Sequence, residues 1–513
     1  MFRRKQAKQK KAIGDIAIVG MACRFAGATN YEEFWSNLQA GVSSISEVSP
    51  ARWDWRQYHG DPATEPGKTN IKHAGFIADI DEFDAHFFGL LPKEANYMDP
   101  QHRIFLECVW HTLADAGYRP SSLSGKAIGV YCGVSKNDYA ELMREQGIEI
   151  APFVSTGTVH SLIANRVSFL LNVRGPSETV DTACSSGLVA LHNAIRAIHH
   201  GDCEAAIVGG VNAILSPTMT ISHSRSGMLA VDGKLKTFDE GADGYVRGEG
   251  VAALLLKPLA AAEAAGDTIW GVIKAAAVNH GGRSNFLTSP SAKAQSAVIQ
   301  QAMKAADIAP ESISYIECHG TGTKLGDPIE IEGLKAAYHA LSGESSVVPH
   351  SCALGSVKPN IGHAEPVAGL AGLIKVLLAM KHGELPKLVN YRQQNSYIDL
   401  ADSPFYILEK NEAWPVHQQG HPSLPLRAAV SSFGMGGVNA HVIVERYTKR
   451  HSKRANKGHK GPYFMPLSAK TAQQLTAYAQ CHQTFLGEQA DRMQGGVIEQ
   501  QFLTDVSYTL RTG

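Results

Sequence analysis

The sequence predicts an α/β fold built from two similar halves, with helices packed on buried strands. Short apolar segments bounded by glycine alternate with segments of helical periodicity, as in parallel α/β proteins. This alternation occurs twice along the 513 residues. The composition, 44% hydrophobic and 19% charged, is that of an ordinary globular protein with a large core.

The predicted first half covers residues 13–262 and follows a basic tail at residues 1–12. A polar segment at residues 52–68 is expected to be a surface loop. The apolar segments that predict buried strands are residues 15–20, 127–134, 205–211 and 244–256, and helices are predicted at residues 31–38 and 98–116.

The predicted second half covers residues 263–445, after a change of composition at residues 258–266. Strands are expected at residues 269–278 and 313–317, and helices at residues 292–306 and 366–380. Because we find no residue-level repeat between the halves, the duplication is inferred from the order of elements. Residues 446–462 are basic and are interpreted as a linker, and residues 463–513 resume a helical pattern that stops abruptly, as in a fragment of a longer chain.

Charge and cysteine usage exclude several classes of protein. Acidic and basic residues both number 48, so no global field favours nucleic acid or a membrane surface. We expect a cytoplasmic protein, because no apolar segment is long enough to span a membrane or form a signal peptide. The eight cysteines lack paired spacing, which argues against a disulfide framework and against a metal site.

The periodicity of residues 177–198 changes at Cys184. The segment around Val180 favours a short strand, whereas apolar residues recur at helical spacing after the cysteine. Small neighbours leave the N–H groups of the first helical turn free to face the sulfur, and the positive end of a helix favours a thiolate. Cys184 is therefore a candidate nucleophile; the alternative is an inert buried cysteine.

Two histidines lie in glycine-rich loops at predicted strand ends, where α/β proteins place their sites. His319 follows a strand, and His363 precedes an apolar helix with Lys358 nearby. Adjacent side chains on a strand point to opposite faces, so Cys318 is expected in the core. For any single histidine among 22, a surface or satisfied core position is the alternative.

A further glycine-rich loop at residues 431–441 allows backbone donors to approach a substrate carbonyl. It does not match the dinucleotide-binding pattern, because Asn439 occupies the last glycine position, and residues 320–324 do not match a phosphate loop. Nucleotide cofactors are therefore not expected. Two chemistries remain: hydrolysis through an acyl-thiol, which needs one histidine, and decarboxylative condensation, in which two imidazole N–H groups stabilise an enolate. The pair of histidines favours condensation.

Four ordered motifs resemble those of the ketosynthase domain of a modular polyketide synthase, in the β-ketoacyl synthase family. They are residues 182–186 (TACSS), 319–323 (HGTGT), 360–363 (NIGH) and 432–437 (SFGMGG). The resemblance implies a thiolase-type fold, with two duplicated halves in an α/β/α/β/α layered core, a homodimer, and a small α/β linker subdomain that begins at residues 463–513. Gly372 departs from stand-alone fatty-acid enzymes, which carry a glutamate there, and agrees with modular synthases.

The resemblance also implies roles for individual residues. Cys184 would accept the acyl chain, and His319 and His363 would promote decarboxylation and stabilise the enolate. Lys358 would support them, and the backbone N–H groups of Cys184 and Phe433 would form the oxyanion hole. The residues implied in the substrate-channel loops are Thr321, Thr323, Asn360, Gly434 and Gly436.

The implied reaction extends an acyl chain by two carbons with malonyl on an acyl carrier protein. The partners would be an upstream carrier that donates the acyl chain, a downstream malonyl carrier and other synthase domains. Phosphopantetheine would arrive on the carrier, and this chain would bind no cofactor or metal. Residues 52–55 (RWDW) and 279–285 (NHGGRSN) resemble synthases whose acyltransferase is a separate protein. The alternatives are a non-elongating ketosynthase, a scaffold without catalysis and a thiol hydrolase.

Overall fold

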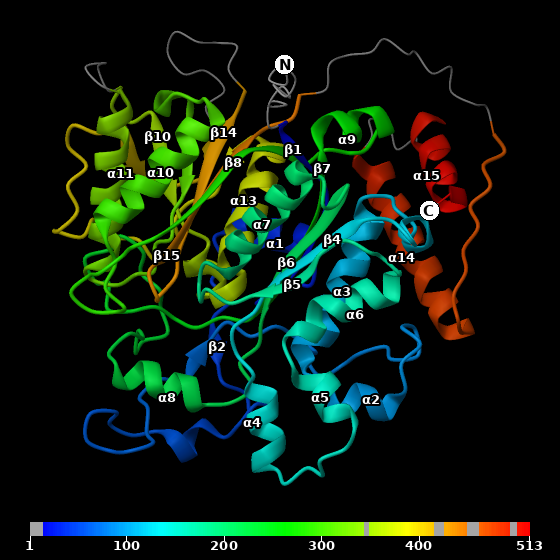
Figure 1. Cartoon of the computed structure of the whole chain (residues 1–513), viewed down its shortest axis with the longest axis horizontal. Helices are drawn as coiled ribbons and strands as arrows, with labels where there is room; N and C mark the ends of the chain where they lie inside the picture. The colour runs from blue at the N-terminus through cyan, green and yellow to red at the C-terminus, as the bar shows by residue number, and fades with distance from the viewer. Residues whose placement is uncertain (1–13, 343–347, 415–424, 449–460, 493–499, 513) are drawn as a thin grey trace, which may run out of the picture.

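The computed structural model describes residues 14–342, 348–414, 425–448, 461–492 and 500–512 (Figure 1). The predicted tail at residues 1–12 and most of the predicted linker, residues 449–460, lie outside the described residues. In the parts of the chain that the structure describes, no helix is long and apolar enough to cross a membrane.

An 11-stranded sheet runs through the molecule, and its two halves have the same strand order. The strands β1 (Ile16–Phe25) and β8 (Gly271–His280) pair at Ile16–Ile18 of β1 and so join the halves. In spatial order the first half consists of β5 (Ser177–Val180), β4 (Ile128–Gly133), β6 (Ala205–Asn212), β7 (Gly250–Pro258) and β1 (Ile16–Phe25). The second half continues with β8 (Gly271–His280), β15 (Val438–Glu445), β14 (Arg427–Phe433), β9 (Tyr315–Glu317), β10 (Cys352–Gly355) and the edge strand β12 (Phe405–Ile407).

The strand pairing confirms the duplication and corrects the expected strand direction. In the first half β4 pairs in parallel with β5 and β6, and β9 pairs in parallel with β10 and β14 in the second. The edge strand β12 also pairs in parallel, with β10. The pairs β6–β7, β7–β1, β14–β15 and β15–β8 are antiparallel. A strand that is buried on both faces is apolar throughout whichever way it runs, so the pattern could not predict this mixed sheet.

Helices form three layers around the two half-sheets. The central layer contains α7 (Ser186–His200), which contacts strands of both halves, and α13 (Ala368–His382), which packs on α7 and β14 (Figure 1). All residues of α13 up to Met380 are buried, as expected for a helix that is apolar on every side. The outer layers consist of α3 (Pro100–Asp115) and α6 (Ser161–Leu171) on the first half, and of α10 (Ala292–Ala306) and α11 (Gly326–Ser342) on the second.

Further elements lie around these layers. The composition change near residue 260 contains the short helix α9 (Leu259–Ala265), and the described part of residues 463–513 contains two helices, α14 (Ala472–Arg492) and α15 (Gln500–Thr512). The other helices are α1 (Tyr31–Ala40), α2 (Pro92–Tyr97), α4 (Asp138–Glu145), α5 (Phe153–Thr158), α8 (Thr218–Arg225) and α12 (Lys358–Ile361). Two small antiparallel pairs are β2 (Ser46–Glu47) with β3 (His73–Ala74), and β11 (Glu384–Leu385) with β13 (Glu412–Ala413).

The segment predicted as a surface loop is anchored in the core through Arg52. Both terminal nitrogens of Arg52 lie 2.8 Å from the carboxylate of Glu249, which is fully buried. That carboxylate also accepts hydrogen bonds from the backbone N–H groups of Ile77 and Ile214. The prediction of a surface loop is therefore wrong for Arg52. Its guanidinium binds the buried carboxylate of Glu249, which lies 197 residues away in the sequence.

Candidate active site

Cys184 lies at the sharp turn between β5 and α7, as the change of periodicity predicts. Ala183 has φ of 57°, in the left-handed region that side chains rarely adopt. Hydrogen bonds hold the turn: the Thr182 N–H donates to Oγ of Ser186 at 2.9 Å, and the Ser185 hydroxyl donates to the Thr182 carbonyl at 2.9 Å. All eight cysteines are free, and Cys184 is the half-buried one that opens onto the central cavity.

The surroundings of the Cys184 thiol oppose its ionisation. Burial, followed by the negative charge of Glu365, raises the pKa of Cys184 to about 11. The backbone N–H of Met435, the charge of Lys358 and the N–H of Cys184 itself act in the opposite direction. The expectation that the helix end favours a thiolate is therefore corrected, since desolvation outweighs the local backbone field.

His319 and its loop are held by two buried carboxylates of α11. Glu330 accepts hydrogen bonds from the N–H groups of His319 and Gly320, at 2.7 and 2.8 Å. Asp327 accepts from the N–H groups of Phe238 and Gly322. Burial raises the pKa of Glu330 to about 7 and that of Asp327 to about 6. These carboxylates aim His319 at the cavity, whereas Cys318 lies in the core as predicted.

His363 presents one ring nitrogen to the cavity. Its Nδ1 accepts a hydrogen bond of 3.0 Å from the backbone N–H of Glu365. Its Nε2 is buried and has no hydrogen-bond partner among the described residues. The ring centroid of His363 lies 5.5 Å from that of His319, with the ring planes at 85°. Two loops that are 44 residues apart in sequence therefore converge on one site.

Both imidazoles are neutral. Burial, together with the positive charge of Lys358, lowers the pKa of His363 to about 3 and that of His319 well below its usual range. Because Nδ1 of His363 accepts a hydrogen bond, the proton of the neutral ring resides on Nε2. Nδ1 of His319 accepts a longer contact, 3.4 Å, from the Phe433 N–H, so the same tautomer follows there. The site thus contains two imidazole N–H donors.

Lys358 lies behind the histidines and does not line the cavity. Burial lowers its pKa, while the carboxylates of Glu317 and Glu330 oppose that effect. Glu317 accepts a hydrogen bond from the Val357 N–H at 2.6 Å and forms a buried ion pair with Lys375 at 2.9 Å. A Cβ atom at Gly372 would lie 2.7 Å from Cγ of Glu317. The absence of a side chain at Gly372 therefore makes room for a carboxylate from β9.

The glycine-rich loop after β14 packs directly against the Cys184 turn. The Ser432 hydroxyl donates to the Cys184 carbonyl at 2.8 Å. A Cβ atom at Gly434 would overlap the carbonyl oxygen of Thr182, so only glycine fits this approach. The N–H groups of Phe433 and Met435 consequently lie at the site, the first toward His319 and the second toward the sulfur.

These groups share a cavity of about 870 Å³. A flap at residues 281–290 forms one wall, and Tyr245 forms part of another. Among the predicted residues, the cavity is lined by Cys184, His319, His363, Phe433, Thr321, Thr323, Gly434 and Gly436. Asn360 lies elsewhere, because its amide donates to the Val42 carbonyl at 2.8 Å, so the expectation that it lines the channel is corrected.

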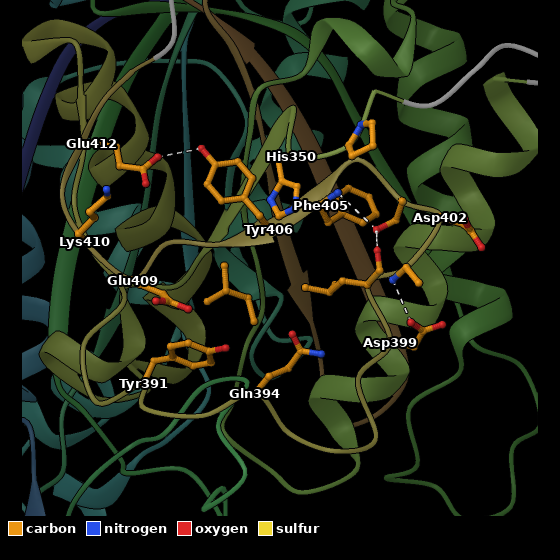
Figure 2. A pocket seen from close by; sticks show the side chains of 15 residues that line it. His350, Tyr391, Gln394, Asp399, Asp402, Phe405, Tyr406, Glu409, Lys410 and Glu412 are labelled. Atoms are coloured by element: carbon orange, nitrogen blue, oxygen red, sulfur yellow. Dashed lines mark hydrogen bonds between the residues drawn. The ribbon is translucent and has the colours of Figure 1, made fainter.

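A second cavity, of about 1030 Å³, lies beside the edge strand β12 (Figure 2). Its wall carries Asp399, Asp402 and Glu409, and the Tyr406 hydroxyl donates to Glu412 at 3.0 Å. It is lined by no cysteine and by neither His319 nor His363. This cavity is therefore not a candidate site for thiol chemistry, although it is larger than the cavity of Cys184.

Four residues of the site carry no clear signal in the sequence: Glu365, Glu330, Tyr245 and Met435. Glu365 falls two residues after His363, just beyond the motif at residues 360–363, and its φ of 46° turns its N–H back toward the ring. Glu330 falls on the first turns of the helix that follows the His319 loop. The sequence signal for a site role of Glu365 or Glu330 is weak, because an acidic residue near a motif is more often on the surface.

Three protein-family models match this chain. They are "Beta-ketoacyl synthase, N-terminal domain" at residues 14–262, the corresponding C-terminal domain at residues 270–392, and "Ketoacyl-synthetase C-terminal extension" at residues 395–503. Polyketide synthase PksN of Bacillus subtilis is 46% identical over 97% of this chain, which spans 9% of that protein. Polyketide synthase ThaG of Burkholderia thailandensis is 44% identical over 84% of the chain, which spans 8% of that protein.

Solved structures agree with these matches. The ketosynthase from module 6 of the bacillaene synthase of Bacillus subtilis superimposes with a TM-score of 0.86 at 39% identity, covering 97% of this chain and 80% of that one. The oxazolomycin ketosynthase domain OzmH KS7 of Streptomyces albus gives a TM-score of 0.86 at 38% identity, covering 97% and 84%. The chain therefore belongs to the β-ketoacyl synthase family, as a condensing acyltransferase with the thiolase-type fold of polyketide synthase ketosynthases.

Proposed function

We propose that this ketosynthase elongates a polyketide chain by decarboxylative Claisen condensation. The observation that carries the proposal is the pair of neutral imidazoles, at 5.5 Å between centroids, in the cavity of Cys184. A thiol alone suffices to hold an acyl group. Two N–H donors beside it suit a reaction in which a second carbonyl oxygen becomes negative.

In the first half-reaction, Sγ of Cys184 attacks an acyl thioester on an upstream carrier. The acyl C–S bond to the carrier breaks, and the thiol proton of Cys184 is transferred to the carrier sulfur, which departs as a free thiol. The N–H groups of Cys184 and Phe433 would stabilise the tetrahedral oxyanion. The 3.4 Å contact of Phe433 with His319 is long, so its N–H is available for a stronger acceptor.

In the second half-reaction, malonyl on a downstream carrier loses carbon dioxide. The electron pair of the broken C–C bond forms an enolate, whose oxygen would accept hydrogen bonds from Nε2 of His319 and His363. The enolate carbon attacks the acyl-cysteine carbonyl, and the Cys184 thiolate leaves. The product is a β-ketoacyl thioester two carbons longer. Lys358 would keep both histidines neutral through its charge.

The proposed partners follow from this chemistry. Both acyl groups would arrive on acyl carrier proteins, with phosphopantetheine passing between Thr321, Thr323 and the flap at residues 281–290. We also propose a homodimer, and functional halves at residues 13–262 and 263–445 that precede a linker at 446–462 and a subdomain from residue 463. We further propose the subclass in which the acyltransferase is a separate protein, because residues 52–55 and 279–285 resemble that subclass.

A non-elongating ketosynthase is the alternative. Such a domain would load an acyl chain on Cys184 and pass it on without condensation. The presence of both histidines in the cavity favours elongation, and a thiol hydrolase would have no use for the second histidine.

The test measures the two half-reactions separately. Purified protein is incubated with an acyl thioester mimic, and intact mass reports acyl-Cys184; malonyl-carrier protein is then added, and β-ketoacyl-carrier is measured by mass spectrometry. We expect Cys184→Ala to abolish loading, and His319→Ala to load but not elongate. His200→Ala, an exposed position on α7, is the matched control. Loading without any β-keto product from the wild type would refute elongation and support the transfer-only alternative.

A further inference from the structure

Helix α8 reaches the catalytic histidine His363 by two separate series of contacts. This helix spans Thr218–Arg225, and it buries Thr220 and His223 while Ser222 faces solvent. Neither series includes a residue of the Cys184 turn. We call the set Thr220, His223, Tyr245, Arg247 and Glu365 the α8 brace.

The first series of contacts ends on the ring of His363. The Tyr245 hydroxyl and Nδ1 of His223 are hydrogen-bonded at 2.7 Å. The ring of Tyr245 then stands edge-on to the imidazole of His363, with 5.3 Å between centroids and 63° between planes. Because Tyr245 also lines the cavity, its ring forms the wall beside the imidazole.

The second series ends on Nδ1 of His363. The guanidinium of Arg247 donates to the Thr220 hydroxyl at 3.1 Å and to the Glu365 carboxylate at 2.7 Å. Arg247 and Glu365 are both buried, and the backbone N–H of Glu365 donates to Nδ1 of His363. The carboxylate of Glu365 is thus held on one side by Arg247, while its backbone holds the imidazole on the other.

Backbone hydrogen bonds keep the two segments in register. The His363 N–H donates to the Val246 carbonyl at 2.7 Å, and the Gly248 N–H donates to the His363 carbonyl at 2.9 Å. The backbone of His363 is therefore fixed, and what remains free is rotation of its ring. One hydrogen bond at Nδ1 permits the ring to tilt about that bond, so the edge contact with Tyr245 determines where Nε2 points.

We propose that the α8 brace positions Nε2 of His363 for the elongation half-reaction, with Tyr245 and Arg247 as its positioning residues. This inference rests on the proposed function, because it assigns the brace to the enolate step. Acyl loading depends on the Cys184 turn and the loop after β14, which the brace does not include; Glu365 acts on the sulfur only through its charge, which none of the variants below removes. Displacement of a donor by about 1 Å costs on the order of 100-fold in rate, so a small tilt of the ring is sufficient to slow elongation.

The test compares Tyr245→Ala, Tyr245→Phe and the control Ser222→Ala on the opposite face of α8. We expect Tyr245→Ala to slow elongation at least about tenfold more than it slows loading, through kcat rather than through KM for malonyl-carrier protein. Tyr245→Phe keeps the ring and loses only the bond to His223, so its ratio of elongation to loading should fall between those of the wild type and of Tyr245→Ala. Ser222→Ala should match the wild type in both half-reactions.

Two outcomes overturn the inference: equal slowing of loading and elongation in Tyr245→Ala, or no slowing of either. If Tyr245→Ala does not fold, as judged by thermal unfolding, Thr220→Val decides the matter, because it replaces only the hydroxyl that accepts from Arg247 with a methyl group. An unchanged ratio of elongation to loading in Thr220→Val would then refute the brace. A wild-type protein that loads but never elongates would instead refute the proposed function, so the two failures are distinguishable.

Discussion

The backbone N–H of Glu365 donates a hydrogen bond of 3.0 Å to Nδ1 of His363. This single contact determines the tautomer of the imidazole, since a nitrogen that accepts a hydrogen bond carries no proton in the neutral ring. The proton is consequently on Nε2 of a histidine that lines the cavity of Cys184. The chemistry of the site thus depends on a backbone group two residues beyond the histidine.

Replacement of His363 should separate the two half-reactions. We expect His363→Ala to lower elongation by about 100- to 1000-fold, the usual cost of one donor to a developing oxyanion. Loading of Cys184 should stay within about threefold of the wild type, because the backbone donors of the oxyanion hole remain. Single-turnover mass spectrometry of acyl-Cys184 and of the carrier-bound product measures both. Equal loss of loading and elongation would contradict this division of roles.

The reactivity of Cys184 should rise steeply with pH. With its pKa raised to about 11, the thiol is almost entirely protonated at neutral pH, and the thiolate fraction grows about tenfold per pH unit below the pKa. We therefore expect the rate of alkylation by iodoacetamide at Cys184 to increase about 100-fold from pH 7 to pH 9. Peptide mapping against Cys184→Ala identifies the site. A plateau below pH 8 would show that the thiolate is stabilised after all.

The loop after β14 offers a matched pair of glycines. Gly434→Ala would place a methyl group against the Thr182 carbonyl, whereas a Cβ atom at Gly436 meets nothing within 4 Å. We expect Gly434→Ala to displace the loop from the Cys184 turn and to lower both loading and elongation at least about tenfold. Gly436→Ala should retain activity. Similar losses in both variants would mean that flexibility of the loop, and not its close approach, is what matters.

Gly372 makes room for Glu317, and a methyl group there should lower stability. A Cβ atom at position 372 would lie 2.7 Å from Cγ of Glu317 inside the central helix layer. Overpacking of a core commonly costs about 1–3 kcal/mol, so the free energy of unfolding of Gly372→Ala should fall by that amount in urea titrations. Gly487→Ala is the control, because α14 leaves open space at that position and alanine favours a helix. An unaltered midpoint for Gly372→Ala would show that Glu317 can move aside.

Local patterns were sufficient to predict several of the elements and the turn that carries Cys184. The predicted helix at residues 292–306 coincides with α10, and the turn at Cys184 lies between β5 and α7 as expected. Periodicity depends only on residues that are close in the sequence, so it can predict an element without knowledge of the fold. The same holds for the opposite faces of Cys318 and His319, which follow from the geometry of a strand.

Relations between distant segments were settled only in three dimensions. The antiparallel return of β7 and β15, the inward pull of Glu249 on Arg52 and the position of Asn360 outside the cavity depend on contacts across long stretches of chain. The ionisation of Cys184 also depends on contacts between distant segments of the chain. A helix end next to the cysteine is visible in its neighbours, whereas the desolvation that raises its pKa comes from the whole cavity wall. The burial of a group depends on every residue that packs around it, and residues far apart in the sequence pack together only in the folded chain.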